Sequence, residues 1–268
     1  MFITSLSIFA MAADTQNIAA LDHQLPGIYT NEEHSYFEKD AGRTPPAWIG
    51  LKIEKQKDQL VITRIDDFGK SIARPLQAAV SAHKIRDNLT VDGCSRNFDR
   101  VESGWVYSAL QNKKACKQDY QIIAVNAAGL KLRFSDGTET SLKRSRPVQC
   151  WAAAKKNQPK ADGSPDWHFA QKLDLHDQGG RVLVGGGESG ADPLVLRMRS
   201  VYWPAPSTNR PSMVLYVHRP DAPDRAVSYS WADINASRVG LNLRWMQASC
   251  TIKGAERPSQ VNPKNFRG

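Results

Sequence analysis

The sequence predicts an all-β protein, an antiparallel β-barrel or calyx cross-linked by disulfides. Apolar and polar residues alternate with a period of two almost everywhere beyond residue 45, which is typical of half-buried strands. Short turns separate these runs and leave no room for helical crossovers, so neighbouring strands should pair antiparallel. An even number of cysteines, four, supports a disulfide-stapled fold.

The first predicted strand covers residues 47–54, in which apolar side chains occupy one face and Lys52 and Glu54 lie on the other. Asp136-Gly137 marks a hairpin between two later strands, because both central residues of a type I′ turn need positive φ. A helix fits only residues 23–39 and 74–82. The other expected strands are 59–65, 71–80, 104–110, 119–125, 129–135, 138–144, 148–154, 166–176, 181–184, 193–203, 212–219, 225–231 and 239–252.

The first twelve residues have the features of a secretory signal peptide. They form a short apolar stretch that ends on the small residues Ala10 and Ala12, although the basic residues that normally come first are missing. We therefore expect cleavage after Ala12 and a secreted or periplasmic protein. No later segment approaches the ~18 to 20 apolar residues that a membrane-spanning helix needs.

The mature chain is expected to form a single β-barrel domain over residues 13–253, followed by a flexible tail at 254–268 that is rich in Pro, Asn, Lys and Arg. A polar loop at residues 155–165 offers an alternative, a linker between two β domains. A Cys150–Cys250 disulfide would tie the strand before this loop to the last strand, and it favours one domain.

Four cysteines in a chain that enters an oxidising compartment predict two disulfides. Three pairings are possible, and we favour Cys94–Cys116 with Cys150–Cys250. Zinc is the competing use of cysteine, but the chain has no C-x-x-C pair and no close Cys/His doublet. We therefore expect no metal site.

The chain carries 36 Lys and Arg residues against 27 Asp and Glu residues, a formal net charge of +9. This excess favours association with anionic surfaces or anionic ligands. Nucleic acid is not an expected partner, because the basic residues are dispersed and no DNA- or RNA-binding motif accompanies them.

No residue pattern indicates a catalytic centre. The glycine-rich run at residues 185–190 leads into a strand rather than a helix, so it predicts a hairpin loop and not a phosphate-binding loop. The chain has no G-x-S-x-G motif, and two disulfides leave no free thiol to act as a nucleophile. His168 and His176 share the polar face of one expected strand, and we expect both to lie in solvent.

The expected strand at residues 193–203 carries candidate ligand-binding residues. One face bears Arg197, Arg199 and Trp203 beside two valines. Arginine holds carboxylates bidentately and also stacks on rings, so this face would suit a flat apolar ligand with carboxylate tails if it points into a calyx. The alternative is an outward-facing basic strand that makes ordinary salt bridges.

Aromatic pairs share a strand face at two other places. Trp105 and Tyr107 form one pair, and Tyr229 and Trp231 form the other. Pairs at this spacing usually pack in a core, and less often they form the wall of a ligand site. We count Trp105 and Tyr107 among the candidate ligand-binding residues.

Three segments together resemble the T-type phycobiliprotein chromophore lyase family (CpcT/CpeT-like). Residues 25–34, LPGIYTNEEH, are similar to the family's opening, in which a glycine and an aromatic residue precede Asn and a polar helix start. Residues 92–116 contain Gly93-Cys94, Gly104 and Cys116, which looks like the family's Gly-Cys…Gly…Cys hairpin. Residues 177–181, DQGGR, are similar to a late Asp-Arg-Gly turn.

The resemblance implies a lipocalin-like calyx that holds an open-chain tetrapyrrole, a bilin, and helps to attach it to a cysteine of an acceptor protein. The activity implied is therefore that of a lyase. The family's Tyr-Arg-Gln segment has no clear counterpart here beyond residues 74–77, which add Arg74 to the candidate ligand-binding residues. The resemblance covers about half of the chain.

Together these observations lead to two expectations for function. The first is an exported, chromophore-lyase-like β-barrel that binds an amphipathic, carboxylate-bearing small molecule such as a tetrapyrrole, with no other cofactor. The alternative is a noncatalytic envelope protein that binds anionic lipid, polysaccharide or a protein partner through its basic surface.

Overall fold

The protein is almost entirely β-structure. The computed structural model describes residues 20–83, 86–110, 116 and 118–254. The expected signal peptide, residues 1–12, lies outside the described residues, and so does the expected tail apart from Gly254. The all-β barrel fold predicted from the alternation is confirmed, as are the disulfides Cys94–Cys116 and Cys150–Cys250.

Ten antiparallel strands of the described chain close into a barrel in the order β1-β10-β9-β8-β7-β6-β5-β4-β3-β2. Most neighbours in this order are consecutive in sequence, because short turns such as Asp136-Gly137 return the chain directly to the adjacent position. The strands are β1 (Gly27–Thr30), β2 (Gly50–Gln56), β3 (Gln59–Ile65), β4 (Leu76–Ala82), β5 (Arg86–Val91), β6 (Cys94–Val101), β7 (Gly104–Leu110), β8 (Tyr120–Asn126), β9 (Gly129–Phe134) and β10 (Glu139–Arg144).

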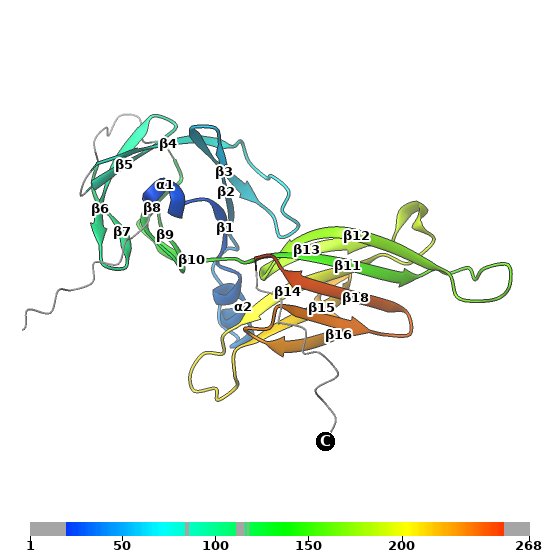
Figure 1. Ribbon diagram of the computed structural model, residues 1–268. Coiled ribbons are helices and arrows are strands. Elements are labelled where there is room, and N and C mark those ends of the chain that lie inside the picture. Colours follow the sequence, from blue (N-terminus) through cyan, green and yellow to red (C-terminus); the bar gives the residue numbers. More distant parts are fainter. Residues whose placement is uncertain (1–19, 84–85, 111–115, 117, 255–268) are drawn as a thin grey trace, which may run out of the picture.

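A short helix, α1 (Leu21–Gln24), closes one end of the barrel (Figure 1). Leu21 and Leu25 are fully buried in the apolar barrel core. The backbone N–H of Leu21 donates to the Asp87 carboxylate at 3.1 Å, and Lys55 Nζ lies 2.9 Å from the carboxylate of Asp22. These contacts fix α1 at the end of the barrel where β2 ends and β5 begins.

The remaining strands form two four-stranded sheets, in the orders β12-β11-β18-β17 and β13-β14-β15-β16. Both sheets contribute side chains to one apolar core, so they pack face to face as a sandwich. Cys150 lies directly opposite Cys250 on β11 and β18. The strands are β11 (Pro147–Lys155), β12 (Trp167–His176), β13 (Gln178–Val184), β14 (Leu194–Val201), β15 (Ser212–Arg219), β16 (Ala222–Asp233), β17 (Arg238–Asn242) and β18 (Met246–Ile252).

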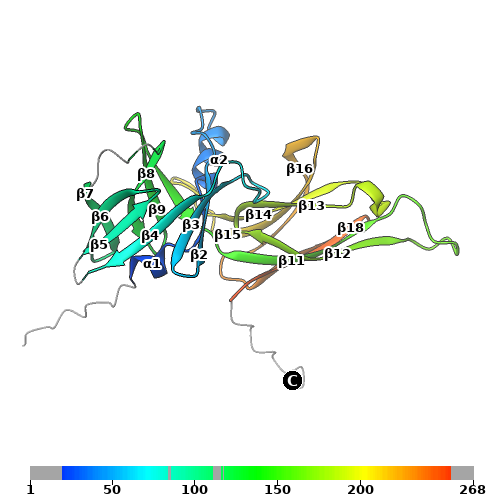
Figure 2. The same ribbon diagram turned by 90° about the horizontal axis from the view of Figure 1, so that it is seen from above.

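A second helix, α2 (Glu32–Asp40), lies where the barrel meets the sandwich (Figures 1 and 2). It follows β1 directly and contacts β13 of the second sheet. Gly179 permits this approach, because it has a φ of 87° and a Cβ there would lie 2.6 Å from Glu32 Cγ. Among the described residues, no helix is long and apolar enough to cross a membrane.

Several element boundaries differ from expectation. The closed barrel ends at residue 144 rather than extending to residue 253, because the later strands pair in separate sheets. The segment at 74–82, which fits either a strand or a helix by pattern, contains strand β4, and the expected helix at 23–39 is interrupted by β1. The expected strand at 239–252 is two strands, β17 and β18. Strands β5 and β6 have no counterpart in the alternation pattern.

Candidate functional site

Arg96 is the most unusual side chain of the barrel wall. It lies on β6, directly opposite Leu89 of β5, while Cys94 lies opposite Val91. Residues directly opposite each other in an antiparallel pair point to the same face. Leu89 and Val91 belong to the apolar barrel core, so the side chain of Arg96 is directed into the barrel.

The guanidinium group of Arg96 is buried without a counter-ion in the described part of the chain. Only 3% of the residue is exposed, and neither Nε nor Nη2 has a hydrogen-bond partner. Burial lowers the pKa of Arg96, and the nearby Tyr107 opposes this only in part. A buried charge without a partner is strongly unfavourable, so this position is a candidate site for an anion.

Two of the predicted ligand-binding residues share this interior. Trp105 and Tyr107 both lie on β7, where Trp105 is 3% exposed within the barrel core and Tyr107 packs against that core. Tyr107 lies opposite Phe98, two residues along β6 from Arg96. The structure therefore places Tyr107 near the buried cation, whereas Trp105 lies two residues nearer the α1 end of the barrel.

A pocket of about 400 Å³ opens at the end of the barrel opposite α1. Its apolar lining comes from Ile62 and Leu76, and Arg64 and Tyr120 add polar groups. Arg64 makes no ion pair with a described carboxylate. Burial raises the pKa of Tyr120 to about 12, so its hydroxyl remains a neutral hydrogen-bond donor at physiological pH.

Arg74, the candidate that the family resemblance added, lines the same pocket. Its guanidinium pairs with Asp92, and 76% of its side chain is exposed. The same carboxylate accepts the backbone N–H of Gln77 at 2.9 Å. Arg74 therefore already has a carboxylate partner at the rim, whereas Arg96 has none inside.

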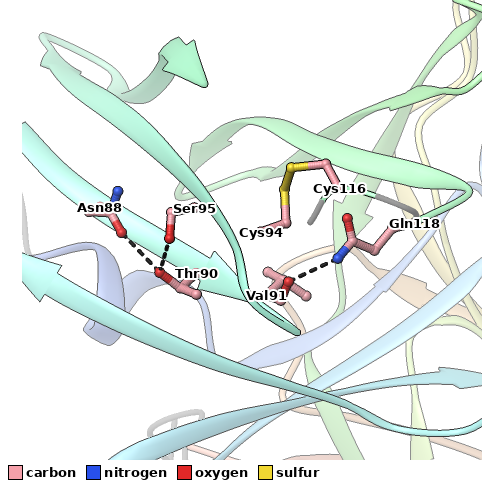
Figure 3. Close-up of a disulfide and its surroundings, with 7 residues drawn as sticks. All are labelled: Asn88, Thr90, Val91, Cys94, Ser95, Cys116 and Gln118. Carbon is pink, nitrogen blue, oxygen red and sulfur yellow. Dashed lines mark hydrogen bonds between the residues drawn. A yellow bond between two sulfur atoms is a disulfide. The ribbon is translucent and has the colours of Figure 1, made fainter. Parts of the chain in front are cut away.

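The disulfide Cys94–Cys116 lies at this end of the barrel (Figure 3). Gln118 stands beside it and donates its side-chain N–H to the carbonyl oxygen of Val91 at 2.9 Å (Figure 3). Gln118 also lines the pocket, and its Oε1 has no hydrogen-bond partner. Since Arg96 follows Cys94 by two residues, its side chain lies on the same inner face, two residues further from the mouth.

The structure places Arg197, Arg199 and Trp203 elsewhere, at the junction between barrel and sandwich. Arg197 forms an ion pair with Glu32 of α2, and Arg199 Nε lies 3.6 Å from the same carboxylate. The guanidinium of Arg199 also lies 3.6 Å from the ring centre of Tyr36. This face of β14 is therefore buried, but outside the barrel interior. Its two arginines pair with Glu32, a carboxylate of the chain itself.

Trp203 belongs to a continuous series of ring contacts on the same side of the second sheet. Its ring centre lies 6.0 Å from that of Phe37 on α2 and 6.5 Å from that of Trp231 on β16. Tyr229 contacts Trp231 in turn, at 5.8 Å. The predicted set of ligand-binding residues is thus divided between the barrel and the junction.

The expectation that His176 lies in solvent is wrong. His176 is 4% exposed, and neither ring nitrogen has a hydrogen-bond partner. The alternation fails because β12 carries an irregularity opposite residues 150–152 and Lys172 has a φ of 55°. His176 then lies where the chain passes from one sheet to the other, and burial lowers its pKa to about 4.

The glycine-rich run at 185–190 connects β13 to β14, as the sequence predicts for a hairpin loop. The described residues contain no group of three His, Cys, Asp or Glu side chains that could hold a metal ion. Arg96 is the site residue that sequence reasoning missed. Counting in steps of two from Cys94 would have placed it on the inner face with Phe98, although no strand was expected there.

Comparison with protein-family models, curated proteins and solved structures finds no match for the chain. The resemblance to chromophore lyases therefore stays a prediction, and function is inferred from the barrel interior.

Proposed function

We propose that the barrel binds an amphipathic small molecule that carries a carboxylate, and that Arg96 is its anchor. The observation that supports this proposal is the buried guanidinium of Arg96, which has no carboxylate partner among the described residues. Bound carboxylate would supply that partner, since arginine holds carboxylates through two parallel hydrogen bonds.

The surroundings of Arg96 define the rest of the ligand. The apolar body of the ligand would contact Tyr107, and the ligand would reach Arg96 from the pocket between Arg64 and Tyr120, which Arg96 itself does not line. A volume of about 400 Å³ is within the range of ~300 to 1,000 Å³ for small-molecule sites. Since α1 and apolar side chains occupy the far end, the ligand lies in the half of the barrel nearest this mouth.

An open-chain tetrapyrrole belongs to this ligand class, because it combines a flat apolar body with carboxylate groups. Attachment of such a chromophore to a protein, the lyase activity that the family resemblance implies, would need a thiol from the acceptor protein. All four cysteines of this chain form disulfides. Binding is therefore this chain's part in the proposal, and chromophore transfer is a separate prediction.

Replacing Arg96 by Met tests the proposal, because Met keeps the apolar stem and removes the charge. We expect Arg96→Met to weaken biliverdin binding about ten- to a hundredfold, the loss of one charge-assisted bond worth about 1.5 to 3 kcal/mol. Without ligand, the same change should raise the free energy of unfolding by about 1 to 4 kcal/mol, since it removes an uncompensated buried charge. Absorbance titration and urea denaturation measure the two effects.

Arg133→Met is the matched control. Arg133 is an exposed barrel arginine on β9 that pairs with Glu139, so its loss should change neither biliverdin affinity nor stability appreciably. The proposal fails if the wild-type protein binds neither biliverdin, heme nor a long-chain fatty acid. It also fails if Arg96→Met binds as tightly as the wild type.

The alternative, adhesion to anionic lipid, polysaccharide or a protein partner through a basic surface, depends on the net charge of +9 alone. Several exposed cations of the barrel already pair with carboxylates, among them Arg86 with Asp99 and Arg133 with Glu139. Export also stays a prediction. The two disulfides fit an oxidising compartment.

A further inference from the structure

A cavity of about 890 Å³ opens at the end of the sandwich that lies away from the barrel. Strand β11 begins at Pro147, directly after the barrel, and ends beside the cavity at Lys155. Strand β14 begins at the cavity and β15 ends there, so the opening lies between the two sheets. It is separate from the barrel mouth, and nothing in the proposed function uses it.

The cavity has an apolar floor and one aromatic wall. Ala154 and Leu194 belong to the sandwich core and are 1% and 7% exposed. Trp245 lines the cavity from the turn between β17 and β18, with 38% of the residue exposed. The turn is held in place because the backbone N–H of Lys155 donates to the carbonyl oxygen of Trp245 at 2.9 Å.

The polar lining is electrically balanced. Lys156 is already paired with Asp166 at 2.8 Å. The described residues provide no ion-pair partner for Lys155 and Arg219, two cations, or for Asp192 and Asp221, two carboxylates. Asp192 accepts one hydrogen bond from the side chain of Asn157, at 3.0 Å.

This combination narrows the class of ligand. A carboxylate or phosphate could pair with Lys155 or Arg219 but would place a like charge beside Asp192 and Asp221. An acyl chain would remove water from both carboxylates without replacing its hydrogen bonds. Hydroxyl groups act as donors and acceptors at once, so a hydroxyl-rich ligand can satisfy carboxylates and cations together. Aromatic rings such as that of Trp245 offer a flat apolar surface with a polar edge.

We propose that this cavity binds a neutral oligosaccharide. The apolar face of one sugar ring lies on Trp245, and its hydroxyl groups donate to Asp192 and Asp221 and accept from Arg219. Because the ligand is neutral, its affinity does not fall with salt, in contrast to a charged ligand on an exposed site.

The test uses the full chain with both disulfides oxidised, titrated by calorimetry with maltotriose, cellotriose and N-acetylchitotriose. We expect at least one of these sugars to bind, with the same affinity in about 50 mM and about 500 mM NaCl. Trp245→Ala should weaken that binding at least about tenfold and Trp245→Phe less, because Phe keeps a ring. Asp221→Ala should also weaken it.

Trp151→Ala is the matched control. Trp151 is 38% exposed, as Trp245 is, but it lines shallow surface pockets on the other side of its sheet. Its loss should leave sugar affinity unchanged. Three outcomes overturn the proposal: none of the sugars binds at millimolar concentration, Trp245→Ala binds as the wild type does, or laurate competes for the site. Melting curves confirm that each variant is folded.

Discussion

Two buried histidines should lower the free energy of unfolding at acid pH. His176 and His218 are 4% and 2% exposed, and burial lowers the pKa of each to about 4 from an ordinary value near 6.5. Nearby Arg197 and Arg181 lower the pKa of His218 further. As the pH falls from about 6.5 to 4, the unfolded chain binds protons that the folded chain does not, so the folded state loses stability.

We therefore expect the free energy of unfolding to be flat above pH 7 and to fall between about pH 6.5 and 4, by up to about 3 kcal/mol for each histidine. Urea denaturation across this pH range measures the effect. His176→Gln should reduce the slope, while His34→Gln, a change on the exposed side of α2, should not. If the free energy of unfolding of a variant without His176 and His218 depends on pH as strongly as that of the wild type, carboxylates cause the effect instead.

Arg96 and His176 show what the alternation pattern can predict at single positions. The pattern correctly places Trp105 and Tyr107 on one strand face, because β7 has no irregularity between them. It fails at His176, where an irregular pairing and a residue with positive φ break the period of two. It also passes over Arg96, since β6 carries charged and amide side chains at inward and outward positions alike.

Among the elements, α2 has the most consequential contacts. Its first residue, Glu32, is the carboxylate that neutralises Arg197 and Arg199 of β14, and it accepts a hydrogen bond from the indole N–H of Trp48 at 3.0 Å. Every residue of β14 is buried. The sandwich core covers one face, and on the other face Glu32 and Tyr36 of α2 contact the two arginines of the strand. Glu32 is therefore the one side chain of α2 that neutralises the two buried arginines of β14.

Glu32→Gln should lower the free energy of unfolding by about 3 to 5 kcal/mol, because it leaves buried arginines without a counter-ion. Glu38→Gln, on the exposed side of the same helix, should have little effect, since its pair with Arg43 is solvent-accessible. Adding Arg197→Met to Glu32→Gln should recover part of the loss in a double-mutant cycle. Equal destabilisation by the Glu32 and Glu38 changes in urea denaturation would contradict this role.

Contacts of this kind explain why the elements were easier to predict than the site. Strands such as β2, β3 and β9 follow from local alternation and short turns. The pairing of Glu32 with Arg197 joins residues 165 positions apart, and no local pattern specifies it. From the sequence alone, Arg197 and Arg199 therefore had no visible partner and suggested an external ligand.

The whole molecule has two apolar cores joined by a polar junction. One core fills the barrel and the other fills the sandwich. Across the junction, Thr30 donates to the carbonyl oxygen of Gln178 at 3.1 Å, Arg181 lies 2.9 Å from Asp67, and the backbone N–H of Tyr202 donates to Glu33 at 2.7 Å. These contacts would be lost if either part unfolded alone, so they couple the two cores.

This coupling predicts how the full chain unfolds. With both disulfides oxidised, we expect one calorimetric transition, which should broaden in Glu32→Gln, because the junction then loses the ion pairs of Glu32 but keeps the three contacts above. In that variant, adding Cys150→Ala and Cys250→Ala should lower the unfolding temperature of the sandwich more than that of the barrel. That disulfide joins residues 100 positions apart, which corresponds to about 4.7 kcal/mol in the chain-entropy model, against about 3 kcal/mol for Cys94–Cys116. Two independent transitions in the wild-type protein would show that the junction does not couple them.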